Sequence, residues 1–268
     1  MQAVRQVLGR MVDLVFPPRC RVCETESACP LCPACVARLE YITGPICHAC
    51  GLPLDPGTHH GDRCAPCRDP HPLDRARSVC RYAGLTRKAI HELKYSQRTE
   101  LAPPLGDLMV RCLADPPEYG PAADPYYTPP PRIPLEGITA VVPVPLSREQ
   151  QRRRGFNQSE RLAIELGSRL GLPVFAWMLQ RIRDTPPQVR LSARERARNV
   201  RGAFQAAGRD SVADQVVLLV DDVLTTGATL NECARVLKRA GAADVYGITM
   251  ARQTVLPTPE AAPASHVV

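Results

Sequence analysis

The residues best suited to bind a ligand lie in one short segment near the C-terminal end of the 268-residue chain. Val217–Thr229 reads VLLVDDVLTTGAT, with four aliphatic residues, two carboxylates and then a loop rich in hydroxyls. We expect the backbone N–H groups of this loop, and of the helix that follows it, to form a cradle for a phosphate. Thr225, Thr226 and Thr229 would add hydroxyl donors, and Gly227 would let the ligand approach the backbone closely.

Two adjacent carboxylates, Asp221 and Asp222, stand where the predicted strand ends, at the carboxyl edge of a sheet. Carboxylates do not bind phosphate but suit the hydroxyls of a ribose, or Mg²⁺ through water, and we assign this pair as the catalytic residues. With Ala228 completing the loop, the segment resembles the phosphoribosyl-diphosphate (PRPP) binding signature of type I phosphoribosyltransferases. It lacks the G-x-x-x-x-G-K-[ST] pattern of a P-loop.

A second group of reactive side chains lies near the N-terminus. Eight cysteines form four C-x-x-C pairs, namely Cys20 and Cys23, Cys32 and Cys35, Cys47 and Cys50, and Cys64 and Cys67. Two such pairs supply the four thiolates of a tetrahedral zinc site, so the sequence predicts two structural Zn²⁺ ions. Redox chemistry or a catalytic zinc is the alternative. The spacing leaves two pairings open, one sequential and one cross-braced, with the first pair joined to the third and the second to the fourth.

Composition divides the chain into segments. Residues 1–16 place apolar side chains at helical spacing and predict an amphipathic helix, and residues 17–72 form the Cys-rich zinc-binding module. Residues 73–253 have the pattern of one globular domain. Within it, residues 114–137 form a Pro-rich insertion that we expect at the surface and poorly ordered, and residues 254–268 are predicted to be a disordered tail.

Strand and helix patterns alternate along the globular domain. Predicted strands cover Ser78–Tyr82, Ile138–Pro145, Val216–Val220 and Val245–Met250. Predicted helices cover Thr86–Tyr95, Leu101–Leu113, Ser159–Leu170 and Thr229–Ala240. This alternation is typical of an α/β fold, with a twisted and mostly parallel sheet flanked by helices on both faces.

Further motifs connect these two regions and point to one family. They are His91-Glu-Leu-Lys94-Tyr, Val141-Val-Pro-Val-Pro145-Leu, Arg153-Arg-Gly-Phe-Asn157-Gln158, Thr185-Pro-Pro-Gln188 and Asn199-Val-Arg-Gly-Ala-Phe204. With the cysteine module and the phosphate loop, this order resembles the ComF family from about Cys20 to Met250. The resemblance implies a type I phosphoribosyltransferase fold with a small N-terminal zinc-binding module, and a link to DNA uptake and natural transformation.

The resemblance also implies roles for several cationic residues. Val144–Arg148 would be the loop that receives the diphosphate, with Arg148 and Arg154 as phosphate contacts, and Lys94 is a candidate second contact. The arginine-rich segment Arg181–Arg201 would include a mobile loop over the site, with a solvated helix face as the alternative. The zinc module would replace or join the variable hood that selects the acceptor in type I enzymes.

The expected activity is displacement of Mg²⁺-diphosphate from PRPP by an acceptor that the sequence does not reveal. Two alternatives stay open: a single-stranded DNA-binding competence factor, and a PRPP-sensing regulator without transferase activity. The net charge of +7 favours anionic ligands of either kind. We expect a cytoplasmic location, since the sequence shows no secretion signal and no apolar run long enough for a membrane span.

Overall fold

The computed structural model describes residues 17–54, 63–116, 129–185 and 192–254. The predicted N-terminal helix, half of the Pro-rich insertion (residues 117–128) and nearly all of the predicted tail lie outside these ranges, so the properties predicted for these residues stay predictions. In the described part of the chain, no helix combines the length and the apolar character that a membrane-spanning segment needs.

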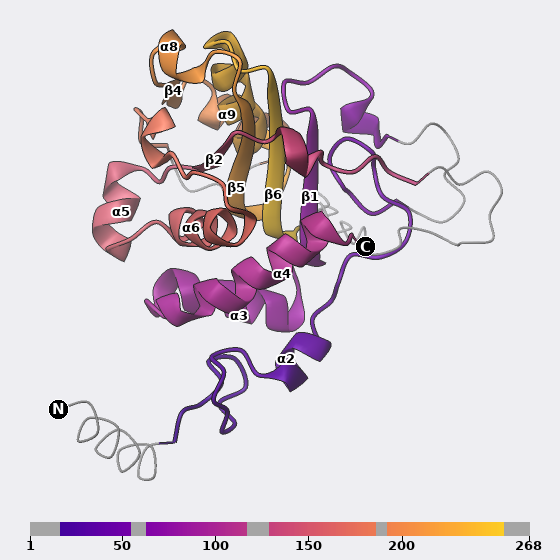
Figure 1. The fold of residues 1–268 in the computed structure, drawn as a ribbon, viewed down its shortest axis with the longest axis vertical. Helices are drawn as coiled ribbons and strands as arrows, with labels where there is room; N and C mark the ends of the chain where they lie inside the picture. The colour runs from indigo at the N-terminus through magenta and orange to yellow at the C-terminus, as the bar shows by residue number, and fades with distance from the viewer. Residues whose placement is uncertain (1–16, 55–62, 117–128, 186–191, 255–268) are drawn as a thin grey trace, which may run out of the picture.

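A four-stranded sheet lies at the centre of the globular domain, in the order β1-β6-β5-β2. The strands are β1 (Arg75–Arg81), β2 (Ala140–Pro143), β5 (Val216–Leu224) and β6 (Asp244–Arg252), and each neighbouring pair is parallel. β5 and β6 occupy the middle of the sheet (Figure 1). Their nearly continuous apolar runs fit this place, because an inner parallel strand is buried on both faces.

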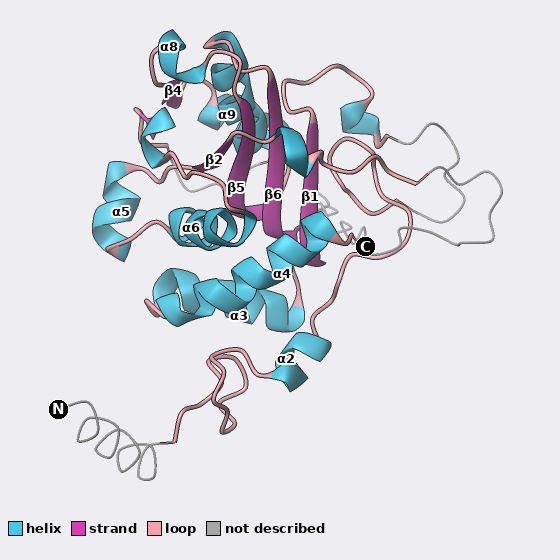
Figure 2. Cartoon of the chain, in the orientation of Figure 1, coloured by secondary structure: helices cyan, strands magenta, loops and turns pink. Residues whose placement is uncertain are grey.

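Alternate residues of β5 enter two hydrophobic cores on opposite faces of the sheet. Leu218 and Val220 belong to the core of α3 (Gly84–Tyr95), α4 (Ala102–Ala114) and α6 (Gln158–Leu170). Val217 and Leu219 belong to the core of α9 (Ala228–Arg239). Figure 2 shows the first three helices on one side of the sheet and α9 on the other. The predicted α/β fold with helices on both faces is therefore confirmed.

The strand that precedes the phosphate loop is longer than predicted. β5 does not end at Val220 but continues through both carboxylates to Leu224, because β6 stays paired with it over the same length. Asp221 is opposite Thr249, and Leu224 is opposite Arg252. The two carboxylates therefore lie within the last residues of the strand, and the loop that can bend around a ligand begins only at Thr225.

Several short elements were not predicted from the sequence. They are α2 (Pro33–Ala37), α5 (Arg148–Arg154), β3 (Leu179–Arg181), α7 (Ala193–Val200), β4 (Phe204–Ala206), α8 (Arg209–Val212) and the 3₁₀ turns Ala65–Cys67, Thr99–Leu101, Leu135–Gly137 and Ala176–Met178. β3 and β4 form a separate antiparallel pair. In the arginine-rich segment expected to include a mobile loop, the later part forms α7, and residues 186–191 lie outside the described ranges.

Segments from outside the sheet pair with both of its edge strands. On β1, the N–H of Ile42 donates to the Val79 carbonyl at 3.0 Å, and Arg81 N–H donates to the Glu40 carbonyl at 2.7 Å. On β2, the N–H of Val141 donates to the Pro173 carbonyl, and its carbonyl accepts from Phe175 N–H, both at 2.9 Å. Residues 40–42, which connect the two halves of the cysteine module, thus lie along one edge, and residues 173–175 lie along the other.

Candidate functional site

The two carboxylates of β5 accept hydrogen bonds from the first residues of α6. Ser159 Oγ donates to Asp221 Oδ1 at 2.8 Å, and the same oxygen accepts the Asp222 N–H at 2.9 Å. Gln158 Nε2 donates to Asp222 Oδ1 at 3.3 Å. Asn157 caps α6 through its side chain, which accepts from Ser159 N–H, and this cap fixes the first turn that carries both donors.

Lys94, near the end of α3, forms an ion pair with Asp222 Oδ2. Burial would raise the pKa of Asp222, but the charge of Lys94 and its hydrogen bond outweigh this effect and lower that pKa. Burial would lower the pKa of Lys94, but the charge of Asp222 and its hydrogen bond outweigh this effect and raise that pKa. Asp221 behaves differently, because burial and the neighbouring charge of Asp222 raise its pKa to about 7.

A cavity of about 200 Å³ opens above this carboxylate pair. Five of the sequence-predicted residues line it, namely Lys94, Arg154, Asp221, Asp222 and Thr229. Other parts of its wall come from the Val144–Leu146 loop and from Gln150, Gln158, Arg181 and Thr185. The cavity thus combines cations, carboxylates and hydroxyls at the carboxyl end of a parallel sheet, where ligands of open α/β folds bind.

The other predicted phosphate contacts lie around the cavity rather than in its wall. Arg148, the first residue of α5, lines a neighbouring cleft. Thr226 and Ala228 line a third cavity, of about 400 Å³, on the side where Pro66 and Pro72 of the cysteine module approach α9. The cysteine module therefore contributes to that third cavity, not to the wall of the one above the carboxylates, so the expected hood role has no support at the carboxylate pair.

The loop between β5 and α9 has the backbone that a phosphate cradle needs. Gly227 is the N-cap of α9 and has a left-handed backbone with φ of +83°. A side chain at this position would be strained, and its Cβ would lie 3.2 Å from Asn231 Nδ2. The first N–H groups of α9 therefore face the loop with the positive end of the helix dipole behind them.

Four residues of the site could not be assigned from the sequence pattern. Ser159 was recognisable only as the start of a helix and Gln158 only as the end of a family motif, although they donate to Asp221 and Asp222. Arg181 was one member of an arginine-rich segment, and Gln150 belonged to no motif. Arg154 is held in place, since its Nη1 donates to Gln158 Oε1 at 2.7 Å and its guanidinium lies 5.0 Å from the centre of the Tyr95 ring.

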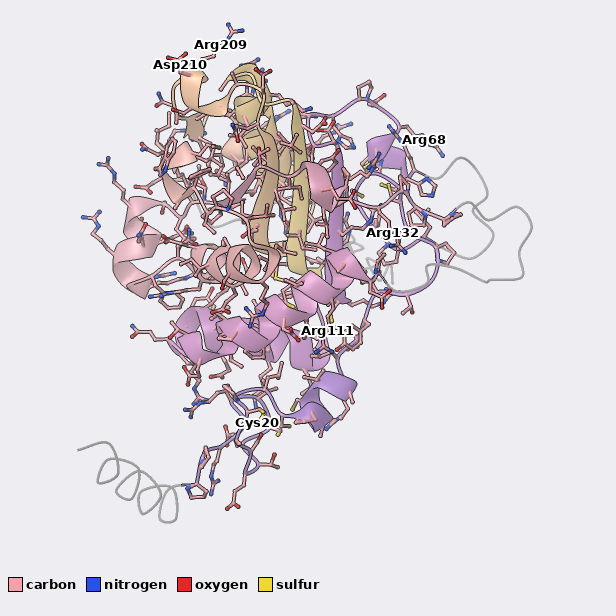
Figure 3. The ribbon with its side chains drawn as sticks, in the orientation of Figure 1. Cys20, Arg68, Arg111, Arg132, Arg209 and Asp210 are labelled. Atoms are coloured by element: carbon pink, nitrogen blue, oxygen red, sulfur yellow. The ribbon has the colours of Figure 1, made fainter. Side chains whose placement is uncertain are left out.

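The eight cysteines form two clusters in chain order. Cys20, Cys23, Cys32 and Cys35 bring their Sγ atoms within 4.8 Å of one another, and so do Cys47, Cys50, Cys64 and Cys67. The cross-braced pairing is thereby excluded. Figure 3 places Cys20 at one end of the molecule, whereas Arg68, which directly follows the last cysteine of the second cluster, lies beside the sheet.

The sulfur positions fit tetrahedral zinc. With Zn–S bonds of about 2.3 Å, the edge of a sulfur tetrahedron is about 3.8 Å. The Sγ–Sγ distances are 3.8 Å for Cys20 and Cys35, 3.6 Å for Cys23 and Cys32, and 3.6 Å for Cys50 and Cys64. These distances are far longer than the ~2.05 Å of a disulfide. Both clusters have the donor set of closed, structural zinc sites.

Comparison with known proteins agrees with this two-part construction. The model of the double zinc ribbon domain matches residues 11–68, and that of the phosphoribosyl transferase domain matches residues 153–265. The DNA utilization protein YhgH of Salmonella typhimurium is 33% identical over 237 residues, covering 87% of this chain and 96% of that protein.

Two competence proteins are also similar. Competence protein F of Haemophilus influenzae is 38% identical over 114 residues, covering 42% of this chain and 50% of that protein. Competence protein ComFC of Bacillus subtilis is 27% identical over 239 residues, covering 83% of this chain and 84% of that protein. The chain belongs to the ComF family. Within this family it is a phosphoribosyltransferase-domain protein with an N-terminal double zinc ribbon.

One contact of this ComF protein joins the second sulfur cluster to the sheet. Arg252, at the end of β6, is 5% exposed. Its Nη1 donates to the Cys50 carbonyl at 2.7 Å, and its Nη2 donates to Cys50 Sγ at 3.3 Å. Arg252 is also the strand partner of Leu224, the residue directly before the phosphate loop. The zinc ribbon is therefore attached to the strand next to the one that carries the candidate site.

Proposed function

We propose that this ComF protein binds PRPP with Mg²⁺ in the cavity above Asp221 and Asp222, and transfers the phosphoribosyl group to an acceptor. One observation supports this most strongly: a pair of carboxylates, of which Asp222 is buried, lies between a hydroxyl-rich loop at a helix N-terminus and the cations Lys94, Arg154 and Arg181. A phosphorylated ribose needs this combination, because carboxylates accept hydrogen bonds from the ribose hydroxyls and cationic groups bind the phosphates at either end of the molecule.

Each part of PRPP has a matching group in this arrangement. The 5′-phosphate fits the Thr225–Thr229 loop, which offers backbone N–H groups and threonine hydroxyls. The ribose hydroxyls would donate to the Asp221 and Asp222 carboxylates. The diphosphate fits the Val144–Arg148 side, near Arg154 and Arg181. Mg²⁺ would be held mainly by the diphosphate, with Asp221 as a contact through water.

The proposed reaction is a displacement at the anomeric carbon. The bond from this carbon to the diphosphate oxygen breaks with its electron pair going to the diphosphate, and a bond to the acceptor forms. Fixed cations at Lys94, Arg154 and Arg181 would stabilise the charge that develops on the leaving group. The proton of the acceptor would pass to Asp221, which lines the cavity and, unlike Asp222, is not paired with Lys94.

We place this activity in the cytoplasm, in the handling of DNA that cells take up or use. The link to DNA is supported by similarity to proteins named for competence and for DNA utilization. A second candidate function, binding of single-stranded DNA, is favoured by α5, where Arg148, Arg152 and Arg153 are exposed beside the site. A PRPP-sensing role without transfer would need the same cavity but no acceptor.

Isothermal calorimetry with PRPP and Mg²⁺ tests the binding proposal. The wild type should bind PRPP, and Asp222→Asn should weaken binding at least tenfold, because it removes one acceptor and the partner of Lys94. Thr229→Val, which removes only one cavity hydroxyl, guards against misfolding of the first variant and should weaken binding several-fold. Asp210→Asn, at the exposed tip of α8, is the matched control (Figure 3). A wild type that does not bind PRPP would refute the proposal.

A further inference from the structure

We propose that the cleft beside the PRPP cavity binds a nucleobase, which stacks on Trp177, with the attached phosphate against Arg148. This inference deepens the second candidate function, the binding of single-stranded DNA, and does not require PRPP to be bound.

The cleft is larger than the PRPP cavity and adjoins it. Its volume is about 720 Å³, compared with about 200 Å³. The two share Pro145, Leu146 and Arg181 in their walls. A cleft of this volume suits a ligand of nucleotide size. A base in it would lie directly next to the groups that are proposed to hold the ribose and the diphosphate.

Trp177 is an aromatic side chain placed for stacking rather than for the core. It is the single tryptophan of the chain and is 51% exposed, and Ile182 on the same cleft is 58% exposed. The Phe175 ring lies 5.5 Å from the Trp177 ring at a tilt of 55°, which supports the indole from one side. A half-exposed indole beside a cleft offers the apolar face on which bases of single-stranded nucleic acid stack.

The polar groups of the cleft match the other parts of a nucleotide. Arg148 and Arg183 are exposed at its rim, and Arg183 is held by hydrogen bonds to the carbonyls of Asn199 and Arg201, at 3.0 and 2.8 Å. Such cations suit phosphate oxygens.

The cleft also contains acidic and amide groups. Glu160, Asp184, Gln151 and Gln180 line it. Carboxylates repel phosphate but accept hydrogen bonds from the exocyclic amino group of cytosine, and amides can pair with base edges. A cleft with carboxylates, amides and an indole together therefore suits a base with its phosphate at the rim, rather than an inorganic phosphate alone.

The fluorescence of Trp177 tests this directly, because no other tryptophan contributes to the signal. Titration with a short single-stranded oligodeoxycytidylate should quench or shift the emission. Free deoxycytidine monophosphate is the second probe, and a duplex oligonucleotide is the third. Tighter binding of the oligonucleotide than of the monophosphate identifies single-stranded DNA as the source of the base. Equal binding identifies a free nucleotide. No change with either single-stranded probe overturns the proposal.

Two variants separate stacking from general attraction to a basic surface. Trp177→Ala should weaken oligonucleotide binding, followed by anisotropy of a labelled strand, by roughly 5- to 100-fold, because the stacking face is lost. Trp177→Phe should restore part of the affinity. Ile164→Ala, which removes a similarly exposed apolar side chain from α6, is the control. Unchanged affinity of Trp177→Ala overturns the proposal. A failure of PRPP to bind in calorimetry would refute the transferase function only.

Discussion

Asp221 and Asp222 are neighbours in the chain but ionise differently because their surroundings differ. Asp222 has a cation, Lys94, as its direct partner, whereas Asp221 has only neutral donors and lies beside a negative charge. The pKa of Asp222 is therefore lowered, and the pKa of Asp221 is raised. In such a pair, Asp222 can stay charged and accept hydrogen bonds from ribose hydroxyls, while Asp221 can exchange a proton near neutral pH.

This difference predicts how stability depends on pH. The folded pKa of Asp221, about 7, lies above its ordinary value of 3.8, so the folded protein binds this proton more tightly than the unfolded chain does. Stability should therefore fall as pH rises between these values. Asp221→Asn carries no charge at either pH, so its advantage over the wild type in free energy of unfolding should already be present at pH 5. This advantage should grow by on the order of 2 to 3 kcal/mol between pH 5 and pH 8.

Urea unfolding at the two pH values measures this difference. Asp210→Asn serves as the control, since an exposed carboxylate should give the same difference at both values. Equal effects of Asp221→Asn at pH 5 and pH 8 would contradict the assignment of a raised pKa to this residue.

The sequence identified the acidic pair, the hydroxyl loop and the cysteines, because each is a local pattern of adjacent residues. It could not show that Lys94 pairs with Asp222, because the partners come from α3 and β5 and meet only in the folded domain. The same holds for Ser159 and Arg154, whose partners lie on other elements. Contacts between distant segments leave no periodic trace in the sequence.

At the scale of elements, the strands of the sheet were predictable because their aliphatic runs are continuous. The extent of β5 was not, since its last residues include two carboxylates and are kept in the strand by pairing with β6. The β3–β4 pair was missed because each strand has only three residues and a long segment containing α7 separates them. So short a strand shows no detectable alternation.

The contact between β6 and the second sulfur cluster predicts a specific loss of zinc. A zinc ion with four thiolates carries a net charge of −2, and the buried Arg252 donates to one of these sulfurs. Arg252→Met keeps the length of the side chain but removes the donor and the charge. It should weaken zinc binding by the second cluster about 10- to 100-fold and leave the first cluster unchanged.

Zinc release to a chromophoric chelator, followed as two phases, measures this effect. Arg98→Met is a suitable comparison, because Arg98 donates to the Arg21 carbonyl of the first half without contacting sulfur. This variant should leave the phase of the second cluster as in the wild type. The interpretation of Arg252 would be wrong if Arg252→Met altered neither phase, or altered both equally.

At the scale of the whole molecule, the two zinc ribbons are embedded differently. Cys20, Cys32 and Cys35 belong to the same hydrophobic core as α3, α4 and α6. Cys47, Cys64 and Cys67 form a small cluster of their own with nearby apolar residues. The first zinc site therefore supports the main core of the domain, and the second supports mainly its own ribbon and the contacts to β1 and β6.

Equivalent substitutions in the two halves test this asymmetry. Cys20 and Cys47 are the first cysteines of their clusters and are both fully buried, at 1% and 0% exposure. Cys20→Ser should lower the Tm by roughly 5 °C or more beyond the effect of Cys47→Ser, because it disturbs the shared core. Scanning calorimetry of both variants, with zinc content measured in parallel, gives the comparison. A larger loss for Cys47→Ser would contradict it.

The segments that pair with β1 and β2 limit how copies of the protein can associate with one another. An edge strand with free N–H and C=O groups is a template on which a second chain can add a strand. Here residues 40–42 and 173–175 already take hydrogen bonds of both edges. Self-association by sheet extension would first have to displace one of them. Because residues 40–42 connect the two zinc ribbons, loss of metal would uncover the β1 edge, so the metal-free protein should be prone to strand-mediated aggregation.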